Sequence, residues 1–238
     1  MCTVVLRVAA DGVALAANRD EMAARPWDPP AAWWPEQPDV IGGRDRLAGG
    51  TWLAVNAHGV AAGVLNRTGS LGPAPGKRSR GELPLLMLRH PTAEAAAEAA
   101  TGLDAGAWRS FNLVLADRTG AWFVRGLGAG RPEAWALSEG VHMVTAHDPD
   151  DADSPRVARH LPRFRAAPVP GPANWDAWRA ILADDSGPAG TELKVPLRAG
   201  FGTVSSAMIF LGYRPAWMFA PGPPHLAAFA PITLTSPG

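Results

Sequence analysis

Cysteine, tyrosine and charged residues are scarce in this sequence. Its 238 residues include one cysteine and one tyrosine, and only 18% of them are charged. A single cysteine excludes an internal disulfide and a metal cluster built on several cysteine ligands. Because 22 basic and 22 acidic side chains give a formal net charge of zero, the chain lacks the positive field that nucleic-acid and anionic-membrane binding require. We therefore expect no nucleic-acid partner.

Long apolar runs are also absent. No stretch approaches the roughly 18 uninterrupted apolar residues of a membrane span, and the N-terminus lacks the basic and apolar regions of a secretory signal. These absences predict a cytoplasmic protein with no integral membrane segment. The six histidines do not recur at the i, i+4 spacing of a helical zinc site, so no metal is predicted. The length and the 47% hydrophobic content suit a single domain over residues 1–238.

Apolar alternation, helix formers and turn residues predict alternating groups of strands and helices. Strands are expected at residues 3–8, 13–17, 51–56, 60–66, 111–126, 133–146, 202–211 and 216–222, and helices at residues 81–90, 92–102, 154–166 and 174–185. The segment 133–146 is expected to be a hairpin, and residues 26–38, with five prolines, a loop. We expect helix caps at Thr92, Ser154 and Asn174. Two antiparallel sheets flanked by helices, an α+β layered domain, would give every amphipathic element a partner.

Cys2 can become the first residue of the mature chain. Methionine aminopeptidase removes Met1 when the next side chain is small, and Cys2 would then carry a free α-amine. An α-amine has a pKa of about 7.7–8.0, so a useful fraction is neutral at pH 7 and can accept the thiol proton. Nucleophile and base would then share one residue. The alternative is that Cys2 is simply a small core residue of an apolar strand.

The tetrapeptide Asn18-Arg19-Asp20-Glu21 follows the second expected strand. A hairpin with its turn at Asp11-Gly12 returns this tetrapeptide to the side of Cys2. A guanidinium at that place would favour the thiolate, and a carboxylate would hold or orient the amine. The alternative is a solvated turn whose charges compensate each other.

Three other segments allow more than one interpretation. Residues 42–50, GGRDRLAGG, are glycine-rich but lack the spacing of a phosphate-binding loop. Residues 147–153, HDPDDAD, offer an imidazole and four carboxylates without the rest of a calcium loop, which favours an acidic, solvated surface loop. Trp27, Trp33 and Trp34 crowd one proline-rich segment, either as core residues or as the wall of an apolar pocket for an acyl chain or a flat ring such as haem.

Several of these segments together resemble one family. The resemblance is carried by the initial Met-Cys-Thr, Asn18-Arg19-Asp20-Glu21, Arg25-Pro26, Gly42-Gly43-Arg44-Asp45, Gly49-Gly50-Thr51-Trp52-Leu53-Ala54-Val55-Asn56, Gly59 and Asn66. They are similar to the NRDE-motif family, the transport-and-Golgi-organisation proteins, and segments 111–117, 154–157 and 201–209 extend the similarity over most of the chain. That family resembles N-terminal-nucleophile hydrolases, among them bile-salt hydrolases, penicillin V acylases and cysteine dipeptidases. The resemblance therefore implies an α+β fold, a four-layer αββα sandwich.

The resemblance also implies roles for individual residues. Cys2 would be the nucleophile that attacks a linear amide, while Arg19 and Asp20 would tune the thiol and place the substrate. The side-chain amide of Asn66 would donate to the oxyanion, a contact typically worth about 10²–10³ in rate. The other polar and aromatic motif residues are predicted to bind substrate: Asn18, Glu21, Arg44 and Trp52.

Two positions depart from the pattern of these hydrolases. Thr145-Ala146-His147 replaces a segment that usually holds a serine-asparagine pair, which leaves His147 as the candidate for a second oxyanion donor. Val204 stands where an arginine is common. A site that lacks both groups could bind a ligand without turning it over.

The sequence supports two hypotheses about function. The first is a cytoplasmic amidohydrolase without cofactor that acts on an N-acyl or peptide-like amide. The second is a non-enzymatic carrier or trafficking protein for haem or for a lipid or acyl-CoA ligand, in which Cys2 or a histidine would ligate the haem iron. The partner is a small molecule in both cases. Neither hypothesis specifies an oligomeric state.

Overall fold

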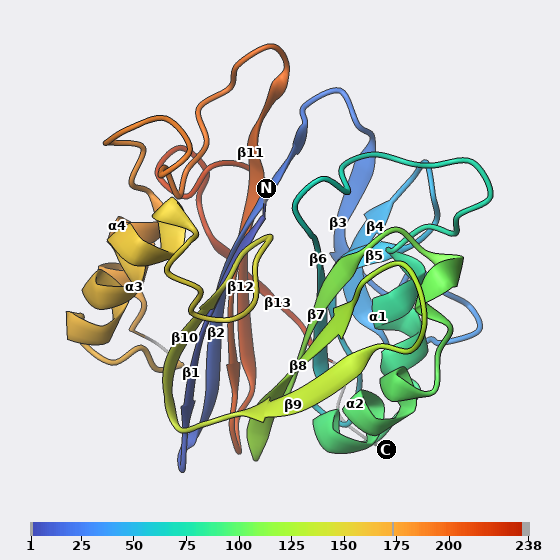
Figure 1. Ribbon diagram of the computed structural model, residues 1–238. Coiled ribbons are helices and arrows are strands. Elements are labelled where there is room, and N and C mark those ends of the chain that lie inside the picture. The colour runs from blue at the N-terminus through green and yellow to red at the C-terminus, as the bar shows by residue number, and fades with distance from the viewer. Residues whose placement is uncertain (1, 173, 235–238) are drawn as a thin grey trace.

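Two antiparallel sheets pack face to face in the computed structural model, which describes residues 2–172 and 174–234. Helices cover the outer face of each sheet, so that four layers follow one another across the molecule (Figure 1). Each sheet thereby buries both of its faces, which satisfies the apolar side chains on both sides of its strands. The prediction of an α+β, four-layer αββα sandwich is confirmed.

Within the described residues one sheet has six strands and the other has seven. In spatial order the six are β10 (Gly140–Val144), β1 (Thr3–Ala9), β2 (Gly12–Met22), β11 (Phe201–Leu211), β12 (Ala216–Ala220) and β13 (Ala230–Ile232). The seven are β3 (Trp27–Ala31), β4 (Ile41–Asp45), β5 (Thr51–Val55), β6 (Ala61–Asn66), β7 (Phe111–Asp117), β8 (Gly120–Gly126) and β9 (Glu133–Leu137).

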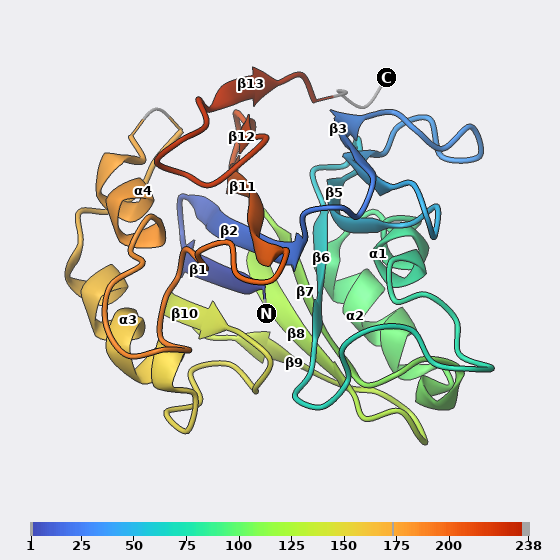
Figure 2. The ribbon, with the colours of Figure 1, turned by 90° about the horizontal axis from the view of Figure 1, so that it is seen from above.

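The helices form the two outer layers, as the view from above shows (Figure 2). The seven-stranded sheet is covered by α1 (Glu82–Met87) and α2 (Ala93–Thr101), and the six-stranded sheet by α3 (Pro155–Ala166) and α4 (Asp176–Leu182). A short 3-10 helix spans Ala105–Ala107. Of the helices in the described residues, none is long and apolar enough to cross a membrane.

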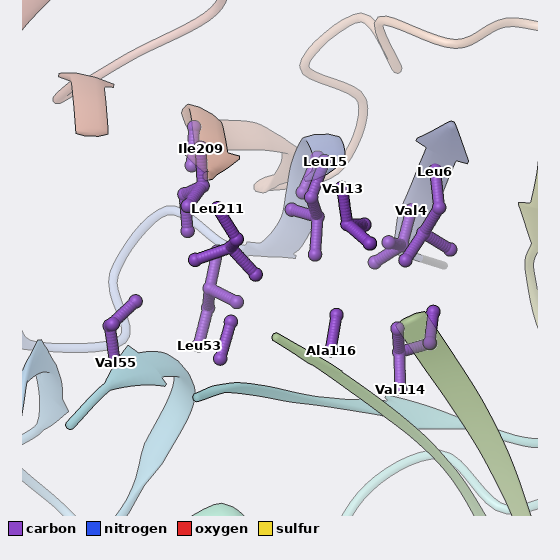
Figure 3. Close-up of a cluster of buried hydrophobic side chains, with 14 of the residues drawn as sticks. Val4, Leu6, Val13, Leu15, Leu53, Val55, Val114, Ala116, Ile209 and Leu211 are labelled. Atoms are coloured by element: carbon purple, nitrogen blue, oxygen red, sulfur yellow. The ribbon is translucent and has the colours of Figure 1, made fainter. Parts of the chain in front are cut away.

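Side chains that alternate along the strands fill the space between the sheets. In β1, Val4 and Leu6 belong to this central core, whereas Val5 packs in a separate cluster with the helices α3 and α4. Figure 3 shows Val4 and Leu6 facing Val114 and Ala116 of β7 across the gap. Full burial of one such side chain contributes about 1.5–3 kcal/mol. Because both faces of the sheets are covered, strands such as β7 are buried along their whole length.

The proline-rich segment contains a strand that the sequence did not predict. Residues 27–31 form β3, in which Pro29 and Pro30 lie between the paired residues Asp28 and Ala31. β3 is an edge strand, and its pairing with β4 is irregular at the two prolines. An edge strand tolerates proline because no further strand needs the missing N–H groups.

The predicted hairpin at residues 133–146 is wrong. β9 pairs with β8 in the seven-stranded sheet, whereas β10 pairs with β1 in the six-stranded sheet. The chain therefore crosses from one sheet to the other between Leu137 and Gly140, near the bottom of Figure 1. Turn residues indicate where a strand ends, but they do not specify which strand it will pair with.

Two of the three predicted helix caps are confirmed. The side chain of Thr92 accepts a hydrogen bond from the Ala95 N–H, and that of Ser154 accepts one from the Val157 N–H. Asn174 does not cap α4, since Trp175 holds the N-cap position without a side-chain hydrogen bond.

The acidic segment 147–153 is a partly exposed surface loop, as predicted, but several of its side chains also have protein partners. Asp148 accepts hydrogen bonds from Arg67, which follows β6, and from Arg125 of β8. The side-chain amide of Asn112 in β7 donates to the carbonyl oxygen of His147. These contacts fasten the connection that follows β10 to the seven-stranded sheet.

Asp150 attaches the same segment to the six-stranded sheet. Its carboxylate accepts hydrogen bonds from the His142 ring (2.8 Å) and from the Met143 N–H (2.7 Å), and it forms an ion pair with Arg165 at 3.3 Å. Asp150 has a left-handed backbone with φ of 61°, which these contacts hold in place. The hydrogen bond to Asp150 raises the pKa of His142.

We predict that Asp150→Asn destabilises the protein more in mild acid than in alkali. A raised folded-state pKa stabilises the fold below the unfolded value of about 6.5, and this stabilisation is lost as pH rises through the folded-state pKa of His142. The expected extra loss at about pH 5.5, relative to about pH 9, is about 1 kcal/mol, or about 2–4 °C in Tm. Asparagine tolerates the left-handed backbone, so strain does not confound the comparison.

Asp176→Asn is the matched control, because Asp176 forms an exposed ion pair with Arg179 and has no histidine partner. Thermal unfolding of both variants at the two pH values checks the prediction. A pH-independent loss of Tm in Asp150→Asn would show that the His142 pair does not contribute.

Candidate active site

Cys2 directly precedes β1, and its half-buried side chain packs against the central core between the sheets. It lines a cavity together with Arg19 and Ser205 from the six-stranded sheet and Trp52 from the seven-stranded sheet. The space open to the centre of a water-sized molecule is about 20 Å³, enough for about one water. The thiol therefore faces a narrow cavity that both sheets bound.

The hairpin of β1 and β2 brings the NRDE tetrapeptide to Cys2, as predicted. Thr3 pairs with Asn18, and Sγ of Cys2 lies 3.8 Å from the carbonyl oxygen of Asp20. The tetrapeptide belongs to β2 itself, and its first three side chains are at most 6% exposed. The alternative of a solvated turn is therefore wrong.

Strand alternation divides the tetrapeptide between two layers. Arg19 points with Ala17 into the space between the sheets, where it lines the Cys2 cavity. Asn18 and Asp20 point to the opposite face, the one that α3 and α4 cover, and contact Leu182 and Arg156 there. Of the two charged residues nearest Cys2, only the cation is therefore inside the cavity.

Arg19 is held by an aromatic side chain and an acidic one. Its guanidinium carbon lies 4.1 Å from the ring centroid of Trp52, within the range of a cation–π contact, and its Nη2 lies 3.9 Å from Glu21. The other terminal nitrogen, Nη1, is buried and has no hydrogen-bond partner among the described residues. A buried charged donor without a partner is costly, so this nitrogen is suited to bind a ligand oxygen in the cavity.

Gly43, in the glycine pair 42–43, packs directly against Trp52 and leaves no room for a side chain. A side-chain carbon at residue 43 would overlap the six-membered ring of Trp52. Trp52 is also fixed from another side by an edge-to-face contact with Trp27, at 5.7 Å between ring centroids. Gly43 thus makes room for the indole on which Arg19 rests.

Asp20 is buried on the α3 side of β2, and two of its partners come from distant segments among the described residues. Its carboxylate accepts a hydrogen bond from the Thr203 hydroxyl (2.6 Å) and forms an ion pair with Arg156 at 3.4 Å. Burial raises the pKa of Asp20, while Arg156 and the Thr203 hydrogen bond act against this rise. Sequence reasoning assigned no role to Arg156 or Thr203, although both lie in segments that carry the family resemblance.

The surroundings of Cys2 favour the protonated thiol. Burial raises the pKa of Cys2, and the negative charge of Asp20 raises it further. The positive charge of Arg19 acts in the opposite direction. Because thiolate is the nucleophilic form, a proton acceptor close to Sγ is needed before Cys2 can react.

Two of the residues predicted to bind substrate already have protein partners. The Asn18 amide donates to the carbonyl oxygens of Leu182 and Leu193 and accepts from the Ser206 hydroxyl, so both of its N–H groups are used. Glu21 accepts a hydrogen bond from the neighbouring backbone N–H of Met22 and lies near Arg19. Asn18 thus connects β2 to the layer of α4, and Glu21 supports Arg19.

Two other predicted residues lie apart from the cavity lining. Arg44 on β4 forms an ion pair with Asp28 on β3. Asn66 ends β6 and pairs with Phe111, so it shares the face of the sheet that packs under α1 and α2. It is the preceding residue, Leu65, that lines the cavity. The oxyanion role of Asn66 stays a prediction.

The two departures from the hydrolase pattern lie close to the site. The chain after β10 runs on past the start of β1, and there the Thr68 N–H donates to the carbonyl oxygen of Ala146. The His147 ring lies between Thr68 and Asp151, at 3.5 and 3.3 Å. Val204 lies in a β-bulge of β11, between Thr203 and Ser205.

Solved structures with this architecture define its class. Penicillin V acylase from Agrobacterium tumefaciens matches with a TM-score of 0.59 and 16% identity over 93% of this chain and 83% of that one. An N-acylethanolamine-hydrolyzing acid amidase ortholog from Caenorhabditis elegans matches with a TM-score of 0.61 and 11% identity over 89% and 93% of the two chains. A mutant conjugated bile acid hydrolase from Clostridium perfringens matches with a TM-score of 0.54 and 11% identity over 100% of this chain and 99% of that one. The chain thus has the fold of N-terminal-nucleophile hydrolases.

A sequence family model also matches most of the chain. The family model of Transport and Golgi organisation 2 matches residues 1–167. The chain belongs to this family, as its motifs predicted. No curated protein sequence matches it.

We predict that Gly43→Ala destabilises the protein by disturbing the contact between Trp52 and Arg19. The added carbon would overlap an indole that neighbouring side chains hold in place, and overpacking of this kind typically costs about 1–3 kcal/mol. Gly63→Ala on β6 is the control, because its side-chain carbon would meet Leu53 at 3.4 Å, an ordinary contact. Thermal unfolding should place Gly43→Ala below both the control and the wild type, and three equal values of Tm would contradict the assignment.

Proposed function

We propose that this chain is an amidohydrolase that cleaves linear amides, N-acyl or peptide-like, with Cys2 as the N-terminal nucleophile after removal of Met1. The observation that carries the proposal is the Cys2 thiol in a cavity beside the buried, partly unpartnered guanidinium of Arg19. An amidohydrolase needs a nucleophile, a base and donors for the charge that develops on the carbonyl oxygen. The proteins named acylase and amidase among the structural neighbours support amide chemistry on this fold.

The α-amine of Cys2 is the proposed base. In its neutral form it accepts the Sγ proton, directly or through one water, and the thiolate attacks the carbonyl carbon of the amide. The resulting ammonium returns the proton to the leaving nitrogen as the C–N bond breaks and a thioester forms. Water then attacks the thioester carbonyl while the amine accepts a proton from it. The C–S bond breaks, the carboxylic acid leaves, and the ammonium returns the proton to sulfur. This base supplies the proton acceptor that the raised pKa of Cys2 requires.

Arg19 and Asp20 act on Cys2 from the two faces of β2. The Arg19 cation lies on the cavity side and stabilises negative charge on sulfur and on the substrate oxygen. Asp20 lies on the other side, close to the start of β1, where its carboxylate is suited to orient the amine. The ion pair with Arg156 keeps this buried carboxylate in position.

The other walls of the cavity favour an apolar acyl group. Val4 and Ala207 from one sheet and Leu53 and Leu65 from the other line it. The space beside Cys2 holds about one water, so side chains at the rim have to move before an acyl group or any other ligand can enter.

We predict that the purified protein has lost Met1 and that Cys2→Ala abolishes hydrolysis. The intact mass should be lower by one methionine residue, and brief alkylation at neutral pH should add one group, at Cys2. The hydrolysis of a panel of fatty-acyl and amino-acid amides should fall by several orders of magnitude in Cys2→Ala, as expected for loss of a nucleophile.

A glycine inserted before Cys2 separates the nucleophile from its base. This variant keeps the thiol but moves the free amine to another residue, so it should be alkylated and yet hydrolyse no amide. Hydrolysis that survives in Cys2→Ala, or full activity in a protein that retains Met1, would refute the proposed function.

A further inference from the structure

One strand irregularity lies directly beside the Cys2 cavity. In the ladder between β11 and β2, Thr203 pairs with Asp20 and Ser205 pairs with the next residue of β2, Arg19. Val204 is therefore an extra residue, a β-bulge. In a regular ladder Val204 would pair with Arg19. Because of the bulge, Ser205 and its hydroxyl take that position instead.

The bulge also changes which side chains of β11 face the cavity. Thr203 binds Asp20 on the helix side of the sheet, whereas Ser205 lines the cavity with Cys2 and Arg19. The following residue, Ser206, again points to the helix side, where its hydroxyl donates to Asn18 at 2.8 Å. Ser206 and Asn18 also border the cavity, but their side chains bond to each other on the helix side, so the side chains of the two adjacent serines face opposite layers.

Ser205 is buried and its hydroxyl is unused. The residue is 1% exposed, and in the described part of the chain its side chain makes no hydrogen bond. Nη1 of Arg19 is a fully buried donor in the same cavity for which the described residues offer no partner. A buried cationic donor without a partner is costly for the empty protein, and together with the adjacent Ser205 hydroxyl it matches the needs of an oxygen that gains negative charge.

We propose that Ser205 is a catalytic residue whose hydroxyl, together with Nη1 of Arg19, donates to the substrate carbonyl oxygen during attack by Cys2. This inference rests on the proposed function. As the S–C bond forms, the carbonyl π pair moves to the oxygen, which accepts both hydrogen bonds. The pair returns when the C–N bond breaks and the protonated amine leaves. Ser205 keeps its proton throughout.

Ser205 fills a role for which the sequence offered Asn66. Asn66 lies on the opposite face of its strand from Leu65, the residue that lines the cavity. Ser205 lies on the cavity side and next to Arg19 in the ladder. The same bulge has two consequences: it removes Val204 from the position opposite Arg19, and it places the Ser205 hydroxyl there.

The test compares Ser205→Ala with Ser206→Ala and Ser205→Thr. In Ser205→Ala, kcat/KM for amides should fall by about 10²–10³, typical of a lost oxyanion donor, while Tm and the rate of Cys2 alkylation stay unchanged. Ser206→Ala should lower Tm, because Asn18 loses a buried partner, and keep the activity. Ser205→Thr retains a hydroxyl and should restore most of the activity.

Binding of a long-chain aliphatic aldehyde tests the role of Ser205 without requiring amide hydrolysis. The aldehyde forms a reversible hemithioacetal with Cys2, whose oxygen imitates that of the tetrahedral intermediate. Calorimetric titration should show binding weakened about 10- to 100-fold in Ser205→Ala and unchanged in Ser206→Ala. Aldehyde binding that depends on Ser205 without hydrolysis of any amide would refute the proposed function alone. Equal affinity in wild type and Ser205→Ala, or no binding to the wild type, would overturn the role of Ser205.

Discussion

Antiparallel pairing of β1 with β2 is the constraint on which the candidate site depends. The pair Thr3 and Asn18 sets which residue of β2 lies beside Cys2, and alternation then sends Arg19 into the cavity and Asp20 toward α3. A shift of one residue would exchange the two charges between the layers. The apolar residues earlier in the hairpin disfavour such a shift, because larger side chains fill the central core and smaller ones pack under the helices, as with Leu15 and Ala16 of β2.

Charges buried next to this hairpin need partners, and the partners come from three of the four layers. Asp20 receives Arg156 from α3 and Thr203 from β11, while Arg19 rests on Trp52 from the opposite sheet. Breaking a buried pair by removing one member is strongly destabilising, typically by about 3–5 kcal/mol. The positions around Cys2 are therefore held tightly. Nη1 of Arg19, which faces the cavity, is left without a partner among the described residues.

Local patterns predicted most strands and helices, including the first hairpin and the caps at Thr92 and Ser154. They failed where the outcome depended on distant partners. Pro29 and Pro30 indicated a loop, but an edge position makes a strand possible. The turn before Gly140 indicated a hairpin, whereas β10 finds its partner in β1, which lies far away in the sequence. The acidic residues 147–153 do form a surface loop, but their ion pairs with three other segments were beyond local patterns.

The sequence by itself determined the family, the layered fold and the approach of Arg19 and Asp20 to Cys2, because these depend on motifs and on pairing between neighbouring strands. Only the tertiary structure decided which motif residues enter the cavity. Asn18 and Asn66 point to helix-covered faces, Trp52 crosses from the other sheet, and Ser205 is turned inward by a bulge. The direction of a side chain at a strand end depends on register and on the opposite layer, and neither is encoded within a short stretch of sequence.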